Sequence, residues 1–332
     1  MSRWIELEAQ RYMPVAKRAP VVLVRGEGSR VWDEDGKAYL DLVGGWAVNT
    51  LGHSAPVIVD ALTEQAATLI HTSNQFYTVP QLELADLLIE NSPFDRVFFA
   101  NSGVEANEGA VKLVRKYGQH KRNGAYTVIT TDHSFHGRSL AMLTATGKEA
   151  YKQDYGPLPP GFVNVPFNDL DAIKQATNDE TCAIMLEVVQ GEGGVNVATK
   201  EYLQGVRDWC DRNNLVLVFD EVQTGVGRLG TLWGFQKFGV EPDVMTLAKG
   251  LGGGVPIGAF LAKEQYSVFT YGDHGSTFGG NPLATAVALA VMREVLKRDI
   301  PGHVEKVGTR LVQKLEELRK AHPSITDVRG MG

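Results

Sequence analysis

The chain has 332 residues, of which 43% are hydrophobic and 22% charged, and its formal net charge is -6. This length predicts one large domain with a smaller companion, and the composition excludes disordered, collagen-like and disulfide-scaffold proteins. Lys and Arg are scattered along the sequence, so we expect no partner nucleic acid and no membrane surface. Chemistry on small molecules is therefore the predicted kind of function.

The cysteines and the N-terminal sequence indicate the compartment. Cys182 and Cys210 lie in apolar stretches without metal-ligand spacing, which favours two buried thiols in a reducing cytoplasm. The opening sequence MSRWIELEAQRYMP lacks the apolar core of a signal peptide, and no apolar run is long enough for a membrane span. We therefore expect a cytoplasmic protein.

Residues 1–49 carry the signals of β-hairpins. The sequence VVLVRGEGSRVWDEDGKAYLDL sets short alternating runs around Gly-rich and Asp-Gly turns, which favour tight connections between antiparallel strands. We assign this N-terminal segment to the smaller domain.

Residues 50–280 alternate short apolar runs with amphipathic stretches of helical period. This pattern is typical of a mostly parallel sheet covered by helices, and it predicts an α/β class with this segment as the large domain. The expected strands are 96–100, 125–130, 182–187, 215–219, 244–247 and 258–261, and the expected helices are 105–117 and 200–213.

Residues 281–332 open with a helix signal. Asn281 and Pro282 provide a cap and a first turn for LATAVALAVMREVLKRD, and Ile300-Pro301-Gly302 is expected to close that helix. A last helix is predicted from about 304 to 321. A new strand is expected to begin at DVRGMG, so we interpret this segment as a connecting helix and the start of the C-terminal small domain, apparently truncated.

Two residues at predicted strand ends are the strongest candidates for chemistry. The run LVLVF ends in Asp220, Lys249 follows the apolar run of VMTLAKGLGGG, and ligands of open α/β sheets bind at such carboxyl ends. An Asp alone more often caps a helix, and a Lys alone in a turn is usually solvated. Together they supply an amine for a Schiff base and a carboxylate for a pyridine nitrogen, which is what pyridoxal phosphate requires.

The sequence FFANSGVEANEGAVKL predicts a strand, a tight turn and a helix that suit a phosphate group. Ser102 and Glu105 form a capping box, and the backbone amides of Gly103 and Val104 stay free at the positive end of the helix dipole. An ordinary capped helix fits this motif equally well, so it gains weight only beside Lys249 and Asp220.

Two other motifs suggest different chemistry. GVGRLG, residues 225–230, fits a dinucleotide-binding pattern, although five residues separate it from the LVLVF strand and TLWGFQ is a poor start for a phosphate-binding helix. An NAD-dependent dehydrogenase therefore stays as an alternative of another class. His133 and His136 have no carboxylate or Cys at usable spacing, so we expect no metal and a structural or ring-positioning role.

Five motifs, in this order, resemble the class III, or ω-amino-acid, aminotransferases: NSGVEANEGAVK, SFHGRSLAMLTATG, FDEVQTGVGRLG, TLAKGLGGGVPIGA and GSTFGGNPLA. The resemblance covers essentially the whole chain. It implies a fold-type I pyridoxal-phosphate-dependent transferase, with a mostly parallel central sheet covered by helices and a smaller α+β domain built from both chain ends. It also implies a homodimer with shared active sites.

The resemblance gives roles to residues around the cofactor ring. Lys249 resembles the Schiff-base lysine, and Asp220 resembles the partner of the pyridine nitrogen. Gln223 matches the residue that reaches the phenolic oxygen, and Phe135 matches the aromatic ring stacked on the pyridine.

Further roles concern the phosphate and the substrate. Ser102 and Gly103 resemble the phosphate cup, and Thr277 resembles the hydroxyl that the other subunit lends to the phosphate. Arg138 in FHGR resembles the arginine that binds a substrate carboxylate. Glu192 matches an acid that pairs, in the family, with an arginine beyond RGMG, so its expected partner is absent here.

Within the family, the likeness is strongest to enzymes that move the terminal amine of N-acetylornithine to 2-oxoglutarate. This reaction of arginine biosynthesis gives N-acetylglutamate semialdehyde and glutamate. Succinylornithine, ornithine and 4-aminobutyrate are alternative amine donors. An inactive, truncated protein that binds pyridoxal phosphate without turnover is a further alternative. Val188 stands where the family more often has Pro, which we expect to alter a loop only.

Overall fold

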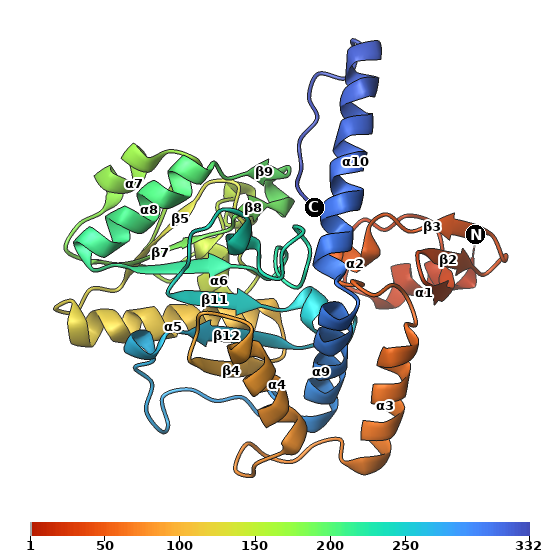
Figure 1. The fold of residues 1–332 in the computed structure, drawn as a ribbon, viewed down its shortest axis with the longest axis horizontal. Coiled ribbons are helices and arrows are strands. Elements are labelled where there is room, and N and C mark those ends of the chain that lie inside the picture. The colour runs from red at the N-terminus through yellow and green to blue at the C-terminus, as the bar shows by residue number, and fades with distance from the viewer. Residues whose placement is uncertain (1) are drawn as a thin grey trace.

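A computed structural model describes residues 2–332. Its largest sheet contains β4 (Arg96–Ala100), β5 (Thr127–Thr131), β6 (Phe162–Val165), β7 (Thr181–Leu186), β10 (Val216–Asp220), β11 (Val244–Leu247) and β12 (Gly258–Ala262). The strand order is β4-β12-β11-β10-β7-β5-β6, with β12 antiparallel to both neighbours and the other pairs parallel. The predicted α/β class and all six predicted strands are confirmed (Figure 1).

Burial on both faces explains why these strands read as continuous apolar runs. Every residue of β5, β7, β10, β11 and β12 is buried, which is typical of strands covered by helices on both sides. The edge strand β6 is only partly buried, and its short sequence FVNV gave no strand signal. The sequence therefore predicted every strand of this sheet except the edge strand β6.

Helices on opposite faces of the sheet form two cores. α5 (Gly103–Lys121) packs on one face, while α7 (Leu170–Ala176) and α8 (Lys200–Asn213) lie on the other. Alternation along β10 places Val216 and Val218 in the core on the α5 side and Leu217 in the opposite core. The two helices predicted in this region are confirmed.

The N-terminal segment forms a separate small sheet beside the main body (Figure 1). It contains α1 (Arg3–Arg11), the antiparallel strands β1 (Leu23–Glu27), β2 (Arg30–Asp33) and β3 (Ala38–Leu40), and α2 (Gly44–Ala47). Asp33 closes the turn after β2, because its Oδ1 accepts from the amides of Asp35 at 3.1 Å and Lys37 at 2.8 Å. The hairpin prediction is confirmed.

The remaining helices are α3 (Pro56–Thr68), α4 (Val79–Glu90), α6 (Leu140–Ala145), α9 (Pro282–Lys297) and α10 (Ile300–Ala321). α9 packs on α3 and α4, whereas α10 projects from the body (Figure 1). The prediction that Ile300-Pro301-Gly302 closes α9 is wrong, because these residues form the first turn of α10. Asp299 caps that turn by accepting from the Gly302 amide at 3.1 Å, and Pro301 needs no amide partner there.

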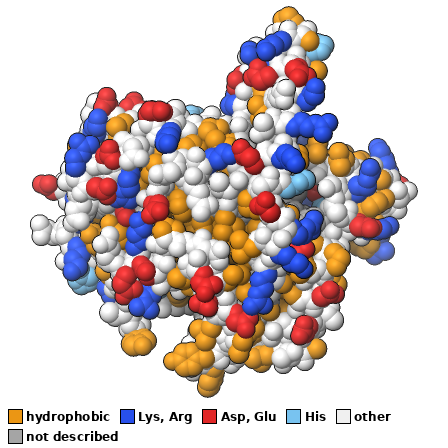
Figure 2. All heavy atoms as spheres, viewed as in Figure 1, with side chains coloured by type: hydrophobic (Ala, Val, Ile, Leu, Met, Phe, Trp, Pro, Cys, Tyr) orange, Lys and Arg blue, Asp and Glu red, His pale blue; other side chains and the backbone are white. Residues whose placement is uncertain are grey.

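The surface carries both signs of charge. Figure 2 shows Lys and Arg interspersed with Asp and Glu over the face in view, with apolar side chains gathered at its lower end. Within residues 2–332, none of the helices has the length and apolar character needed to cross a bilayer.

Candidate active site

The carboxyl ends of β10 and β11 bring Asp220 and Lys249 into one cavity. The two strands are parallel neighbours, Asp220 ends β10, and Lys249 opens a short 3-10 turn just after β11. Both residues line a cavity of about 440 Å³. The structure therefore joins the two strand-end residues that the sequence singled out.

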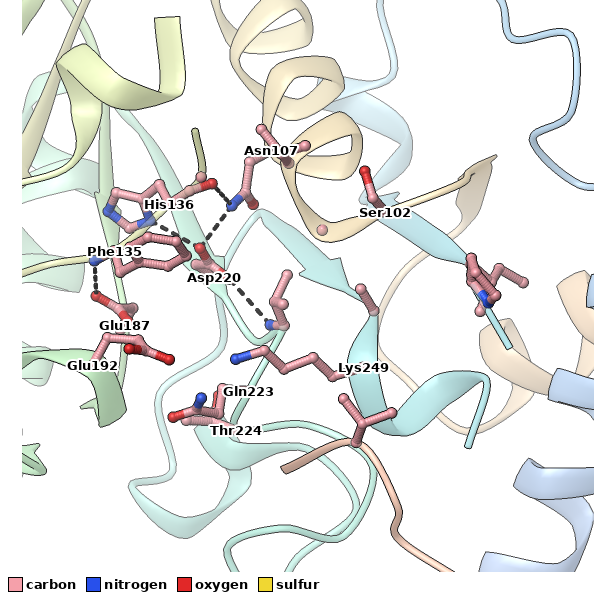
Figure 3. A pocket seen from close by; sticks show the side chains of 18 of the residues that line it. Ser102, Asn107, Phe135, His136, Glu187, Glu192, Asp220, Gln223, Thr224 and Lys249 are labelled. Carbon is pink, nitrogen blue, oxygen red and sulfur yellow. Dashed lines mark hydrogen bonds and ion pairs between the residues drawn. The ribbon is translucent and has the colours of Figure 1, made fainter. Parts of the chain in front are cut away.

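A hydrogen-bond network fixes the carboxylate of Asp220 (Figure 3). Its Oδ2 accepts from Asn107 Nδ2 and from His136 Nδ1, both at 2.8 Å, and its Oδ1 accepts from the Val222 amide at 3.1 Å. Burial acts to lower the pKa of His136, but the hydrogen bond and charge of Asp220 outweigh burial and raise it. The buried imidazole therefore pairs with the Asp220 carboxyl group.

Lys249 points into the space between Asp220, Gln223 and Glu192 (Figure 3). Burial lowers the pKa of its amine, against the opposing effect of the carboxylates of Glu192, Asp220 and Glu187. A neutral amine is thereby favoured relative to a solvent-exposed lysine, and a neutral amine can accept a proton.

Glu187 is a second buried carboxyl group beside the cavity. Its Oε2 accepts from the Phe135 amide at 3.1 Å, which holds the segment that carries the Phe135 ring. Burial raises the pKa of Glu187 to about 8. The ring of Phe135 lines the cavity, as its predicted role beside a cofactor ring requires.

The N-terminus of α5 closes another side of the cavity. Ser102 caps the helix by accepting from the Glu105 amide at 3.4 Å, and the amides of Gly103 and Val104 belong to the first turn, where no intrahelical acceptor is available. Glu105 accepts from the Asn101 amide at 2.6 Å, so the predicted capping box is displaced by one residue. The turn suits an anionic group.

Arg138 and Glu192 line the cavity, while Thr277 does not. The exposed Arg138 guanidinium carbon lies 3.9 Å from the ring centre of Tyr151 and 5.6 Å from that of Phe135. Thr277 lies in a separate depression with Asn74 and other residues. Nine of the ten site residues predicted from sequence therefore meet within one chain: Ser102, Gly103, Val104, Phe135, Arg138, Glu192, Asp220, Gln223 and Lys249.

Some buried polar atoms of the cavity-lining residues have no protein partner. Among residues 2–332, Asn107 Oδ1, His136 Nε2 and Thr224 Oγ1 are buried, lack a hydrogen-bond partner and belong to cavity-lining residues. Buried polar atoms normally have partners, so these atoms indicate space for a polar ligand. A strand-end amine, a fixed carboxylate, an aromatic wall and an anion-binding turn fit a phosphorylated pyridine aldehyde.

Sequence reasoning missed Asn107 and Thr224 and gave no role to Glu187. Asn107 carries a usable signal, since it is a polar residue on a helix face otherwise formed by Ala106, Ala110 and similar apolar side chains. Thr224 and Glu187 carry none, because their importance arises from which segments the fold brings together. His136, predicted to position a ring or support the structure, lies one hydrogen bond from Asp220.

GVGRLG does not form a dinucleotide site. Residues 221–230 are a series of turns, and only the short 3-10 helix Gly234–Lys237 follows them, so no phosphate-binding α-helix begins there. Gly227 and Gly230 have φ values of 84° and 89° and serve these turns. The dehydrogenase alternative is wrong for this reason. No group of three or more metal-ligating side chains occurs within the part of the chain described.

A family model described as "Aminotransferase class-III" matches residues 12–332. The chain is a member of this family. It is an aminotransferase whose cofactor is pyridoxal phosphate, and the fold is fold-type I.

Three individual proteins show which aminotransferases the chain is similar to. A protein of Caldanaerobacter subterraneus subsp. tengcongensis named acetylornithine aminotransferase is 54% identical over 99% of this chain and 84% of its own length. A succinylornithine transaminase of Citrobacter koseri is 48% identical over 96% of this chain and 79% of its own. An ornithine aminotransferase structure from Toxoplasma gondii, described as having partial occupancy of PLP at its active site, is 32% identical with a TM-score of 0.96, covering 99% of this chain and 79% of that one.

Proposed function

We propose that the chain transfers the terminal amine of N-acetylornithine to 2-oxoglutarate, giving N-acetylglutamate semialdehyde and glutamate. The observation that carries this proposal is the convergence of Lys249, Asp220 and Arg138 on one cavity. Arg138 can bind a substrate carboxylate in a bidentate manner while the far end of the substrate reaches Lys249. The acetylornithine name of relatives at 47–54% identity supports the same donor.

The Arg138 guanidinium favours an acylated donor. It lies against the rings of Phe135 and Tyr151. Free ornithine would bring an α-ammonium next to this guanidinium, and like charges at short range repel. Acylation of the α-nitrogen removes that charge and leaves the carboxylate for Arg138.

Each residue has a role that follows from its surroundings. When bound, pyridoxal phosphate supplies an electron-withdrawing ring that stabilises the negative charge left on carbon after a proton is removed. Asp220, held by Asn107 and His136, keeps a proton on the ring nitrogen. The Lys249 amine, whose pKa burial lowers, takes a proton from the substrate carbon and returns it as general base and acid.

The phosphate and the ring edge have their own partners in this proposal. The hydroxyl of Ser102 and the amides of Gly103 and Val104 would hold the phosphate at the α5 N-terminus. Gln223 would reach the phenolic oxygen, and Phe135 would stack on the ring.

A homodimer is part of the proposal. Large apolar side chains between α3 and α4 are exposed to solvent, with exposed fractions of 64% for Phe76 and 92% for Tyr77. Figure 2 shows apolar atoms at the lower end of the molecule in this view. This segment is tied to the segment of Thr277, because Asn74 Nδ2 donates to the Ser276 and Gly279 carbonyls, both at 2.9 Å. Burial of this surface against a second copy would bring Thr277 to the partner's phosphate site.

The proposal extends to the organisation of the chain. We propose a division into residues 1–49 and 281–332 as parts of a small domain and 50–280 as the cofactor-binding domain. A cytoplasmic location fits the free, buried thiols of Cys182 and Cys210.

A comparison of amine donors tests the function. The chain is supplied with pyridoxal phosphate and 2-oxoglutarate, and glutamate formation is measured with N-acetylornithine, N-succinylornithine, ornithine and 4-aminobutyrate. We expect kcat/KM for N-acetylornithine to exceed that for ornithine and 4-aminobutyrate by about tenfold or more, as loss of a charge match typically gives. A preference for N-succinylornithine, the donor named for the relative from Citrobacter koseri, would replace acetylornithine in the proposal.

A further inference from the structure

The loop that carries Glu192 is held from outside through its backbone. Three consecutive carbonyl oxygens accept hydrogen bonds from side chains, two of them from distant segments and one from Asn196 of the same hairpin. Glu192 O accepts from Lys148 Nζ at 2.6 Å, Gly193 O from Asn196 Nδ2 at 3.1 Å, and Gly194 O from Arg329 Nε at 2.8 Å. A loop with these bonds has a defined position relative to the rest of the cavity.

The loop needs such support because its own sequence provides little. Residues 191–194 read GEGG, and glycine loses more conformational freedom on ordering than any other residue. Gly194 has a φ of 108°, and a Cβ on Gly191 would lie 1.5 Å from Gln223 Oε1. The backbone must therefore approach Gln223 closely, and side chains elsewhere supply the bonds that hold it there.

Lys148 differs from the other two donors because it also contacts the substrate end of the cavity. Its amine lies 5.7 Å from the ring centre of Phe135 and 5.4 Å from that of Tyr151. The guanidinium of Arg138 lies against the same two rings. Lys148 is therefore the one residue of the three that touches both the Glu192 loop and the rings beneath Arg138.

A direct ligand role for Lys148 fits less well. The open depression beside it, of about 570 Å³, is also lined by Asp132, Glu149 and Glu192. Three carboxylates around a single ammonium do not favour an additional anionic group. The geometry instead points to a role exerted through neighbouring residues.

We propose that Lys148 is a positioning residue, which fixes the loop of Glu192 relative to the rings that support Arg138. The half-buried amine of Lys148 then helps to set the separation between the acid facing Lys249 and the cation that binds the substrate carboxylate. This inference rests on the proposed function, in which Arg138 binds that carboxylate. It predicts weaker substrate binding without Lys148, with a much smaller loss of turnover.

The test uses the holoenzyme and N-acetylnorvaline, which lacks the terminal amine of N-acetylornithine and cannot react. Calorimetric titration should give a Kd about tenfold higher for Lys148→Met, as expected when a charged hydrogen bond is lost. Lys148→Arg keeps a donor and a cation and should stay within about threefold of the parent. Lys174→Met is the matched control, since Lys174 pairs with Asp171 on its own helix.

Hydrogen exchange separates positioning from a simple loss of charge. The backbone amides of residues 191–195 should exchange faster in Lys148→Met and at the parent rate in Lys148→Arg and Lys174→Met. The kcat with N-acetylornithine should fall no more than about threefold in Lys148→Met, because the reacting groups are unchanged. If Lys148→Met does not fold, Lys148→Gln serves the same comparisons.

Two results would overturn the proposal for Lys148. One is parent-like exchange of residues 191–195 together with an unchanged Kd, and the other is faster exchange with no rescue by Lys148→Arg. Failure of the parent itself to bind N-acetylnorvaline would instead contradict the proposed amine donor. In that case the exchange comparison alone decides whether Lys148 holds the loop.

Discussion

The two sides of the cavity are built in different ways. The Asp220 side consists of strand ends, the start of α5 and the buried His136 of the loop after β5, and its polar groups are joined by short hydrogen bonds. The Arg138 side consists of loops, and Arg138 itself is exposed. Buried hydrogen bonds hold the Asp220 side before any ligand binds, and we call it the rigid side. The Arg138 side relies on contacts between loops, and we call it the loop side.

This difference matches the demands of the proposed reaction. The cofactor ring is the same in both half-reactions, so a fixed carboxylate at its nitrogen serves every step. The substrates differ in length and charge, so the side that recognises them consists of an exposed cation resting on aromatic rings. Substitutions on the rigid side should therefore mainly lower turnover. Substitutions on the loop side should mainly weaken substrate binding.

The largest effect is expected on the rigid side from Lys249→Ala. Without the strand-end amine, kcat should fall by about 10³-fold or more, because proton transfer by a positioned base contributes on this order. Some cofactor should still bind, since Asp220 and the α5 N-terminus remain. Glutamate formation and cofactor absorbance after dialysis measure the two quantities. Lys263→Ala is the control, since Lys263 pairs with Glu241 at the surface, and near-normal turnover in Lys249→Ala would exclude Lys249 as the base.

Asp220→Asn tests the same side through the ring nitrogen. An amide cannot hold the proton on that nitrogen, so kcat should fall by about 10²-fold, a typical cost for removing one stabilising electrostatic contact. Asp220→Glu keeps the charge at a slightly different place and should lose less. Steady-state rates at saturating donor decide the order. Parent-like activity of the Asn variant would mean that Asp220 has only a structural role.

On the loop side, Arg138→Lys should mainly raise KM. A lysine offers a point charge instead of a planar fork, so KM for N-acetylornithine should rise by about tenfold while kcat falls less. Initial rates over a range of donor and 2-oxoglutarate concentrations give both constants. Arg293→Lys, at a surface ion pair with Glu83, is the matched control. A fall in kcat without a change in KM would contradict the division between the two sides.

The same division explains what the sequence could predict. Strands 244–247 and 258–261 were predicted within a residue of their ends, because residues buried on both faces leave continuous apolar runs. Asp220 and Lys249 followed from their positions at strand ends. The rigid side could therefore be derived from residue patterns.

The loop side could not be derived in this way. Arg138 and Glu192 came only from resemblance to a family, and Lys148 gave no signal. Their proximity depends on contacts between segments that are distant in the sequence, such as the bond from Lys148 to the Glu192 carbonyl at 2.6 Å. The boundary between α9 and α10 could not be predicted either. The sequence around Pro301 is compatible both with the first turn of α10 and with an interruption after α9.

The smallest expected effect concerns Glu187, which lies between the two sides and touches the segment of Phe135. Burial raises the pKa of Glu187 from an ordinary 4.5 to about 8, so the folded chain retains a proton there that the unfolded chain loses. Its contribution to stability is complete below pH 4.5 and is lost as the pH rises towards 8.

Glu187→Gln should remove this dependence while keeping an oxygen that accepts from the Phe135 amide. Between pH 5 and pH 8, both within the window set by the two pKa values, the free energy of unfolding should fall less in the variant than in the parent. Denaturant unfolding without added cofactor measures the difference. Glu264→Gln is the control: its exposed carboxylate bonds to Arg96, which lowers its pKa, so any effect lies at more acidic pH. Equal slopes for the Glu187 variant and the parent would mean that Glu187 is already ionised in the folded chain, and its charge would then act on Lys249 throughout this range.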